Sequence, residues 1–210
     1  MSEASTAERP VLSPWLQGQL TTLLARRGHA WLLQGPSGLG QYTLGLELAR
    51  AWLCEHPTPH GACYQCRSCH AIDVRTHADL CTLMPETLAL ELNWPLDEKT
   101  QKDLDDKKRK PSKEIRVEAA RDMVSFSQQT RSGGSTKVVF VYPAERMNHV
   151  TANTILKTRS AGAIPKEMIS AKESNSLPKA LSCPPSRATR PSSISNMKAP
   201  KIQSRLVSYG

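Results

Sequence analysis

Four cysteines close together in the sequence are the residues best suited to chemistry in this chain. Cys54, Cys63, Cys66 and Cys69 follow the spacing C-x8-C-x2-C-x2-C. A C-x2-C pair can bring two thiolates to one side of a tight turn, and four thiolates can close a tetrahedral shell around zinc. A closed shell leaves no position for water, so the spacing predicts a structural zinc site rather than a catalytic one.

Other ligands and another metal stay open for this segment. His56, His60 and His70 lie near enough in the sequence to replace one of the cysteines. The same thiols could also hold an iron–sulfur cluster. The remaining two of the six cysteines are expected to take no part, because Cys81 lies on an apolar segment and Cys183 lies in a low-complexity tail.

A glycine-rich turn forms a second candidate site. Residues 31–43, WLLQGPSGLGQYT, run from an apolar segment through Gly35, Gly38 and Gly40 into a helical pattern. Strand, glycine loop and helix is the context of a phosphate-binding loop, because backbone N–H groups and the helix N-terminus then face an anion. A glycine-rich turn without nucleotide ancestry is the alternative.

The side chains of an active phosphate loop are missing from this turn. Gln41 and Tyr42 stand where the pattern G-x-x-x-x-G-K-[ST] has lysine and serine or threonine. Glutamine has no charge to place against phosphates, and tyrosine is too large to offer a hydroxyl to magnesium there. Thr43 has a suitable hydroxyl but lies about 100° further round the helix. We therefore expect a degenerate phosphate loop that does not bind ATP.

The surrounding hydrophobic patterns supply the elements that would position both sites. Continuous apolar runs predict buried parallel strands, and apolar residues at helical spacing predict helices that cover them. The expected strands are residues 30–34, 80–84 and 137–141, and the expected helices lie within residues 11–27, 41–54, 70–80, 114–129 and 145–158. These elements indicate an α/β fold with a parallel sheet flanked by helices and a cysteine-bearing insertion at residues 54–69.

Two segments lack such patterns. Residues 86–113 form a mixed-charge run, expected to be a solvated loop or a frayed helix. Its basic residues 107–110 could contact nucleic acid, although acidic residues at 103–106 weaken that interpretation. From Arg159 onward the chain is rich in Ser, Pro, Ala and Lys, too poor in apolar residues to offset the entropy cost of ordering. We therefore expect an ordered domain over residues 1–158 and a disordered tail over residues 159–210.

Charge and hydropathy narrow the class of protein. The tail holds nine Lys and Arg against two Asp and Glu, so most of the net charge of +9 lies there. The near-neutral body gives little support for nucleic-acid binding. No apolar run is long enough for a membrane span, and the N-terminus, MSEASTAERP, has no signal region. A cytoplasmic location is expected, where cysteines favour metal binding over disulfides.

Five stretches together resemble one family. They are GHAWLLQGPSGLGQ, the cysteine segment 54–69, THADL, SGGSTKVVFV and TANTILKT, within roughly residues 10–158. In this order and spacing they are similar to the N-terminal part of the delta-prime subunits of bacterial DNA polymerase III. The resemblance implies an AAA+ fold of the P-loop class. It also implies a clamp loader that places the sliding clamp on primed DNA during DNA replication, with gamma or tau ATPase subunits and delta as partners.

The resemblance further implies that the chain is not itself an ATPase, although it would belong to a DNA-directed DNA polymerase (nucleotidyltransferase) complex. Delta-prime is commonly the clamp-loader subunit without ATPase activity. An active relative would have an acidic pair after the apolar strand, where this chain has Tyr142 and Pro143. Without that pair and the loop lysine, phosphoryl transfer has no catalyst.

The resemblance stops after Thr158. The family continues with an acidic stretch, another strand, a Ser-Arg-Cys motif and helical lid and collar domains, whereas this chain continues with the low-complexity tail. The change suggests a frameshift or a truncated reading frame, and would leave the sheet without its last strand. Two other functions stay open, an active P-loop ATPase with an unusual loop and a zinc-dependent nucleic-acid-binding module.

Overall fold

The computed structural model describes residues 12–26, 30–132, 136–160, 167–174 and 202–206. Its helices are α1 (Pro14–Leu24), α2 (Gln41–Leu53), α3 (Arg67–Asp73), α4 (Glu86–Glu91), α5 (Glu98–Asp105), α6 (Val117–Gln128), the 3-10 turn η1 (Ala144–Arg146) and α7 (His149–Ser160). Its strands are β1 (Ala30–Pro36), β2 (Leu80–Leu83), β3 (Val138–Val141), β4 (Glu167–Ser174) and β5 (Gln203–Leu206). None of the helices in these ranges is both long and apolar enough to cross a membrane.

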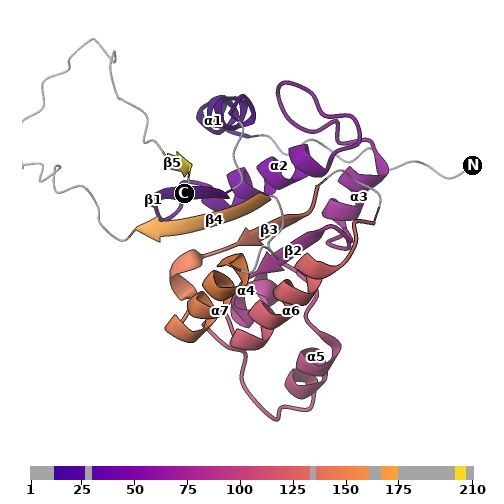
Figure 1. Ribbon diagram of the computed structural model, residues 1–210, viewed down its shortest axis with the longest axis vertical. Coiled ribbons are helices and arrows are strands. Elements are labelled where there is room, and N and C mark those ends of the chain that lie inside the picture. Colours follow the sequence, from indigo (N-terminus) through magenta and orange to yellow (C-terminus); the bar gives the residue numbers. More distant parts are fainter. Residues whose placement is uncertain (1–11, 27–29, 133–135, 161–166, 175–201, 207–210) are drawn as a thin grey trace, which may run out of the picture.

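The five strands form one sheet in the order β2-β3-β4-β1-β5 (Figure 1). The first four strands of this order run parallel, and β5 runs antiparallel to β1. The strands predicted at residues 30–34, 80–84 and 137–141 are β1, β2 and β3. The prediction of an α/β fold with a parallel sheet flanked by helices is therefore confirmed.

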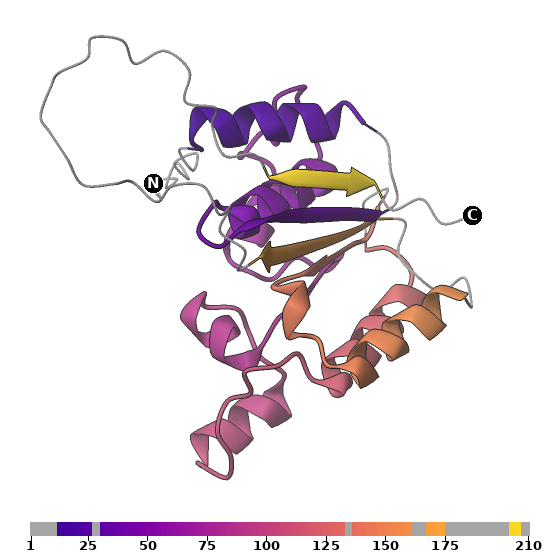
Figure 2. The same ribbon diagram turned by 90° about the vertical axis from the view of Figure 1, so that its left-hand side faces the viewer.

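Helices cover both faces of the sheet (Figures 1 and 2). α1 and α2 lie on one side, and α6 and α7 lie on the other. Successive side chains of a strand point to opposite faces. Along β3, Val138 and Phe140 accordingly join the core beneath α2, whereas Val139 and Val141 join the core beneath α6. All four residues of β3 are buried because helices pack on both of its faces.

α2 approaches the sheet closely at Gly45. A Cβ atom built at Gly45 would lie 2.5 Å from Cε2 of Phe140, whose side chain is fully buried. The helix can therefore take this position only where it has no side chain. Since α2 starts at the glycine loop and ends at the first cysteine of the cluster, this contact helps to position both candidate sites.

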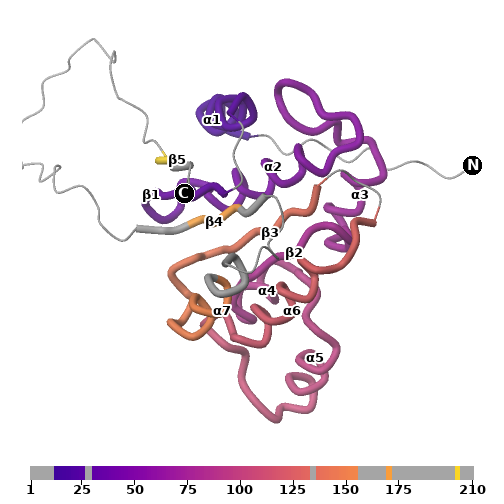
Figure 3. Tube along the Cα trace, in the orientation of Figure 1, coloured from indigo at the N-terminus to yellow at the C-terminus, as the bar shows by residue number. Residues whose placement is uncertain are grey.

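Residues 86–113 are more ordered than the sequence suggested. α4 buries Ala89, and Trp94 just after it is also buried. α5 buries no residue, as expected of a solvated segment, and it lies apart from the sheet beyond α4 and α6 (Figure 3). The sequence pattern missed α4 because six residues are too few for a helical period to show.

Strand β4 corrects the expectation that residues 159–210 stay outside the fold. It lies between β1 and β3, and its Ile169 and Ala171 are fully buried. These few apolar residues suffice because the strand hydrogen-bonds to neighbours on both sides. β5 pairs with β1 and covers that edge of the sheet at Trp31–Gln34, with Ile202 buried beside it. The remainder of the tail beyond α7 lies outside the described residues.

The last predicted helix begins later than expected. η1 occupies residues 144–146, and α7 starts at His149. The side chain of Asn148 accepts a hydrogen bond from the backbone N–H of Thr151 at 2.8 Å, as an N-capping residue does. The Thr151 hydroxyl, fully buried, donates to the carbonyl of Ile115 at 3.0 Å and so ties α7 to the segment before α6.

Candidate functional site

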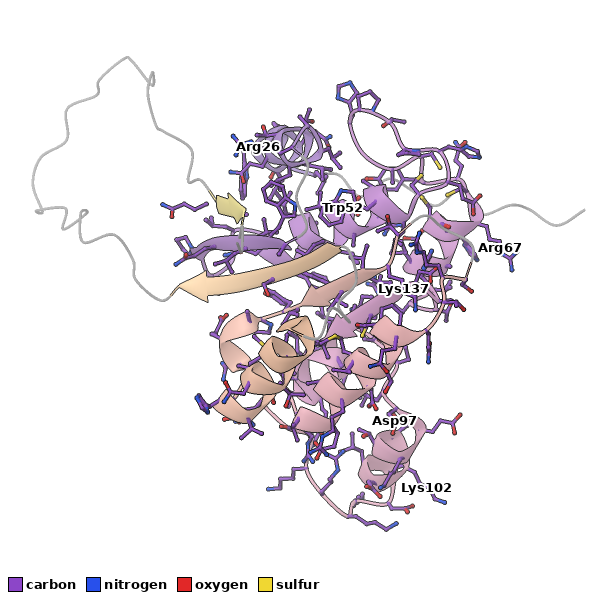
Figure 4. The ribbon with its side chains drawn as sticks, in the orientation of Figure 1. Arg26, Trp52, Arg67, Asp97, Lys102 and Lys137 are labelled. Carbon is purple, nitrogen blue, oxygen red and sulfur yellow. The ribbon has the colours of Figure 1, made fainter. Side chains whose placement is uncertain are left out.

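The end of α2 and the start of α3 bring the four cysteines together. Cys54 is the residue directly after α2, and Cys66 is the N-cap of α3. The sulfur of Cys66 accepts a hydrogen bond from the backbone N–H of Cys69 at 3.4 Å. Cys63 lies in the intervening loop, and its N–H donates to the sulfur of Cys54 at 3.3 Å. In Figure 4 the sulfur atoms gather beside the end of α2.

The sulfur atoms of this cluster have the separations of a tetrahedral metal site. Cys54 Sγ lies 3.4 Å from Cys63 Sγ and 3.8 Å from Cys66 Sγ, and Cys63 Sγ lies 4.0 Å from Cys69 Sγ. All four sulfur atoms lie within 4.8 Å of one another. Thiolates about 2.3 Å from a zinc ion at tetrahedral angles would be about 3.8 Å apart. The four residues could therefore hold a metal ion.

The other candidate ligands lie elsewhere. Within the part of the chain that the structure describes, the group that could hold a metal ion consists of the four cysteines, and His56, His60 and His70 are exposed outside it. Cys81 lies on β2, where burial raises the pKa of its thiol to about 12, as expected of a core residue. Cys183 falls outside the described residues.

The thiols of the cluster differ in how readily they ionise. Burial raises the pKa of Cys54 and that of Cys69. Burial opposes ionisation of Cys63 as well, but hydrogen bonds from the N–H of Gln65 and the thiol of Cys54 outweigh it and lower its pKa to about 6. Because the thiolate is the form that binds metals, Cys63 is a readier ligand than Cys54 or Cys69.

A buried charge network fastens the cysteine segment to α2. Glu47 and Arg50, only 2% and 4% exposed, lie one turn apart on this helix. The guanidinium of Arg50 pairs with Glu47 at 3.2 Å and with Asp73 of α3 at 2.6 Å, and it donates to the carbonyl of Cys69 at 3.2 Å. Glu47 also accepts a hydrogen bond from the hydroxyl of Tyr64 at 2.5 Å. Sequence reasoning missed this network, although two charges in an otherwise apolar helix were its signal.

Asp79, in the THADL stretch, joins the starts of two strands. It is 2% exposed, and its carboxylate accepts hydrogen bonds from the backbone N–H of Ser132 at 3.0 and 3.2 Å. Its own N–H donates to Nδ1 of His77 at 3.0 Å, and its carbonyl accepts from the N–H of Val138 at 3.0 Å. Two of the stretches that carry the family resemblance are thus held together by one buried carboxylate.

The glycine loop between β1 and α2 is closed by its own glutamine. Gly38 and Gly40 have φ values of +82° and +84°, which favour glycine. The side chain of Gln41 is buried, and its Nε2 donates to the carbonyl of Pro36 at 2.6 Å. Gly35 leaves room for this amide, since a Cβ there would lie 3.2 Å from it. The position that carries lysine in an active loop therefore binds the loop backbone.

Tyr42 belongs to an aromatic cluster rather than to a cation site. Its hydroxyl accepts a hydrogen bond from Nε1 of Trp94 at 2.8 Å. Its ring centroid lies 5.8 Å from that of Phe140 and 5.3 Å from that of Tyr142. Tyr142 directly follows β3, where an acidic residue would be needed to help bind magnesium. Two rings in contact thus occupy the positions of a hydroxyl and a carboxylate.

Comparison with known proteins bears on the family to which the chain belongs. The DNA polymerase III subunit delta' of Pseudomonas aeruginosa is 35% identical over 147 residues, which cover 69% of this chain and 38% of that protein. The subunit of the same name from Escherichia coli is 31% identical over 151 residues, with the same coverage of 69% and 38%. A crystal structure of a DNA polymerase III gamma subunit-related protein from Thermotoga maritima superposes with a TM-score of 0.43 at 16% identity, and covers 75% of this chain and 39% of that one.

The chain thus spans 38% of the length of these two curated relatives. The family model described as DNA polymerase III, delta subunit, matches residues 16–159, which include the glycine loop, the four cysteines and strands β1 to β3. Because this match extends over more than half of its residues, the chain belongs to that DNA polymerase III delta subunit family.

Proposed function

We propose that the chain is a non-catalytic subunit of a bacterial clamp loader, which helps to place the sliding clamp on primed DNA during DNA replication. Family membership supports the role in DNA polymerase III. The hydrogen bond from Gln41 to Pro36 carries the non-catalytic part of the proposal. ATP hydrolysis requires a cation against the phosphates and carboxylates that hold magnesium. Gln41 supplies no cation, and Tyr142 supplies no carboxylate.

The partners in this function would be the gamma or tau ATPase subunits, delta and the sliding clamp. They are inferred for a chain that spans 38% of its relatives, and the α/β domain predicted over residues 1–158 would supply the contacts. The chain would then act as a rigid neighbour of ATPase subunits in the bacterial cytoplasm. It would be part of a nucleotidyltransferase complex without being an enzyme itself.

We further infer that Cys54, Cys63, Cys66 and Cys69 hold one structural zinc ion. The sulfur separations near 3.8 Å support this assignment, and four protein ligands would leave zinc no open position for chemistry. The ion would join the end of α2 to the start of α3. Metal analysis should find one zinc per chain, whereas iron with visible absorption would contradict the assignment.

Nucleotide binding tests the first requirement of ATP hydrolysis. A ligand that binds the folded state raises its thermal midpoint by mass action. The full chain should show no shift of its midpoint with millimolar MgATP, under conditions where a sibling ATPase subunit is clearly stabilised. A concentration-dependent rise would overturn the expectation that the loop does not bind ATP and revive the alternative of an active P-loop ATPase, which release of phosphate from ATP by the chain alone would establish.

Reconstitution tests the clamp-loader assignment. The chain would be mixed with delta and gamma subunits, separated by size exclusion, and assayed for ATPase activity that depends on clamp and primed DNA. A stable complex with that activity would support the proposal. Failure of a folded, zinc-bearing chain to enter the complex would refute it.

A further inference from the structure

Residues 86–116 leave the sheet after β2 and return to it at α6, and we name this segment the charged arm (Figures 2 and 3). Glu86, 7% exposed, joins the two ends of the arm. Its carboxylate accepts two hydrogen bonds from the guanidinium of Arg109, at 2.6 and 3.0 Å, and one from the backbone N–H of Ser112 at 2.8 Å. Arg116 pairs with the same carboxylate at 3.1 Å. The loop that returns to α6, residues 107–116, is therefore held in place at three positions; we call it the returning loop.

The returning loop is strongly basic. Six of the ten residues 107–116 are Lys or Arg, and one is acidic. The two arginines are engaged by Glu86. Lys108 pairs with Asp106 at 2.9 Å and lies 4.0 Å from Asp103. From the sequence, Asp103 and Asp106 seemed to offset the charge of the whole basic run. In the structure both of them face Lys108.

Three lysines of the arm keep their charge toward solvent. Lys107, Lys110 and Lys113 are exposed, make no ion pair within the described residues, and follow one another at three-residue intervals along the loop. Glu114 directly follows Lys113, and Asp106, which pairs with Lys108, directly precedes Lys107. We propose that these three lysines form a contact surface for the phosphate backbone of nucleic acid, which in the function proposed above, on which this inference rests, is the primed DNA.

The composition of the loop favours nucleic acid over an acidic protein surface. Protein interfaces have a buried core that is enriched in aromatic residues and depleted in lysine. Residues 107–113, KKRKPSK, contain no aromatic or aliphatic hydrophobic residue that could form such a core. Exposed lysines can neutralise phosphates without being buried, because the release of condensed counterions supplies the free energy.

The test is the salt dependence of DNA binding by the full chain. Binding of labelled primed DNA would be followed by fluorescence anisotropy at several salt concentrations. Each lost phosphate contact lowers the slope of log Kobs against log salt by about 0.7 to 0.9, so K107Q/K110Q/K113Q should lower it by about 2 to 3. The control K99Q/K102Q changes two exposed lysines of α5, which stand among acidic residues, and should keep the wild-type slope.

Several results would overturn the inference. They are an unchanged slope in the triple variant, an equal loss in both variants, or a wild-type chain without salt-dependent DNA binding. Circular dichroism and the thermal midpoint check that both variants keep the fold. If the triple variant fails to assemble with delta and gamma while its slope is unchanged, the lysines bind protein and the inference is wrong. If the wild type fails to assemble but the slope falls as expected, the clamp-loader proposal fails and this surface stands.

Discussion

Gly45→Ala is expected to destabilise the protein, although helices generally prefer alanine. Gly45 lies in the second turn of α2, where alanine would normally be favoured by about 1 kcal/mol. A Cβ atom there would lie 2.5 Å from Cε2 and 2.9 Å from Cζ of Phe140. Carbon atoms attract one another at about 3.5 to 4.0 Å, so these contacts are strongly repulsive. The Phe140 ring is fully buried against Tyr42 and Tyr142 and cannot turn away without disturbing them.

The size of the effect follows from these opposing contributions. Adding a methyl group to a well-packed core costs about 1 to 3 kcal/mol, and contacts this short belong to the upper part of that range. Subtracting the helix preference of about 1 kcal/mol leaves a net loss of about 1 to 2 kcal/mol in the free energy of unfolding.

Urea unfolding followed by far-ultraviolet circular dichroism measures this loss. Gly18→Ala is the matched control, because Gly18 is an exposed residue of α1 and nothing lies within 4 Å of a Cβ atom built there. The control should gain about 0.5 to 1 kcal/mol, so the two unfolding midpoints should move in opposite directions. If Gly45→Ala is as stable as Gly18→Ala, then α2 does not approach β3 as described.

Four further substitutions, in three experiments, test the sites. Cys69→Ser should lose the metal and increase protease cleavage between residues 54 and 70, and unchanged metal content would contradict the ligand assignment. The hydrogen bond from Nε1 of Trp94 to the hydroxyl of Tyr42 should contribute about 1 kcal/mol to the free energy of unfolding. Trp94→Phe and Tyr42→Phe should show that coupling energy in a double-mutant cycle of urea unfolding. Burial raises the pKa of the Glu86 carboxyl, but the hydrogen bond from Arg109 outweighs burial and holds this pKa below its ordinary value. The ionised carboxylate therefore stabilises the fold above about pH 4.3. Glu86→Gln should therefore lose about 1 to 3 kcal/mol at pH 7, with a difference from wild type that shrinks below about pH 4, and a pH-independent difference would refute this account.

The strands that the sequence revealed are those with continuous apolar runs. β3 consists of Val138 to Val141 and stands out because all four side chains are buried. β4 escaped notice because its apolar residues are few and are surrounded by Ser, Lys and Glu. Its place between β1 and β3 depends on partners more than 20 residues away in the chain, and a local pattern cannot contain that information.

The candidate sites could be located from the sequence, but their side-chain partners could not. The spacing of the four cysteines predicted a cluster, and the structure brings their sulfur atoms together. The absence of lysine at residue 41 was visible, but the hydrogen bond from Gln41 to Pro36 depends on the fold of the loop. Glu86 pairs with arginines that lie 23 and 30 positions further along the chain. A local pattern does not show such pairs, so the charged run around Arg109 looked fully solvated in the sequence. Local patterns report which residues are available, whereas tertiary structure decides which of them are paired.

The side chains of Gln41, Tyr42 and Tyr142 depend on one another physically. A neutral amide at Gln41 can lie buried against the carbonyl of Pro36, whereas an ammonium group without a phosphate partner would carry a large desolvation cost there. The ring of Tyr42 in turn needs an apolar neighbour, which is the ring of Tyr142. A carboxylate at residue 142 could not make this apolar contact. Lysine at residue 41 alone would therefore bury an unpaired charge, and serine or threonine at residue 42 alone would leave a cavity beside Phe140. An ATP site could not be built in this loop one residue at a time, because Tyr42 and Tyr142 pack against the core that fixes α2 on the sheet.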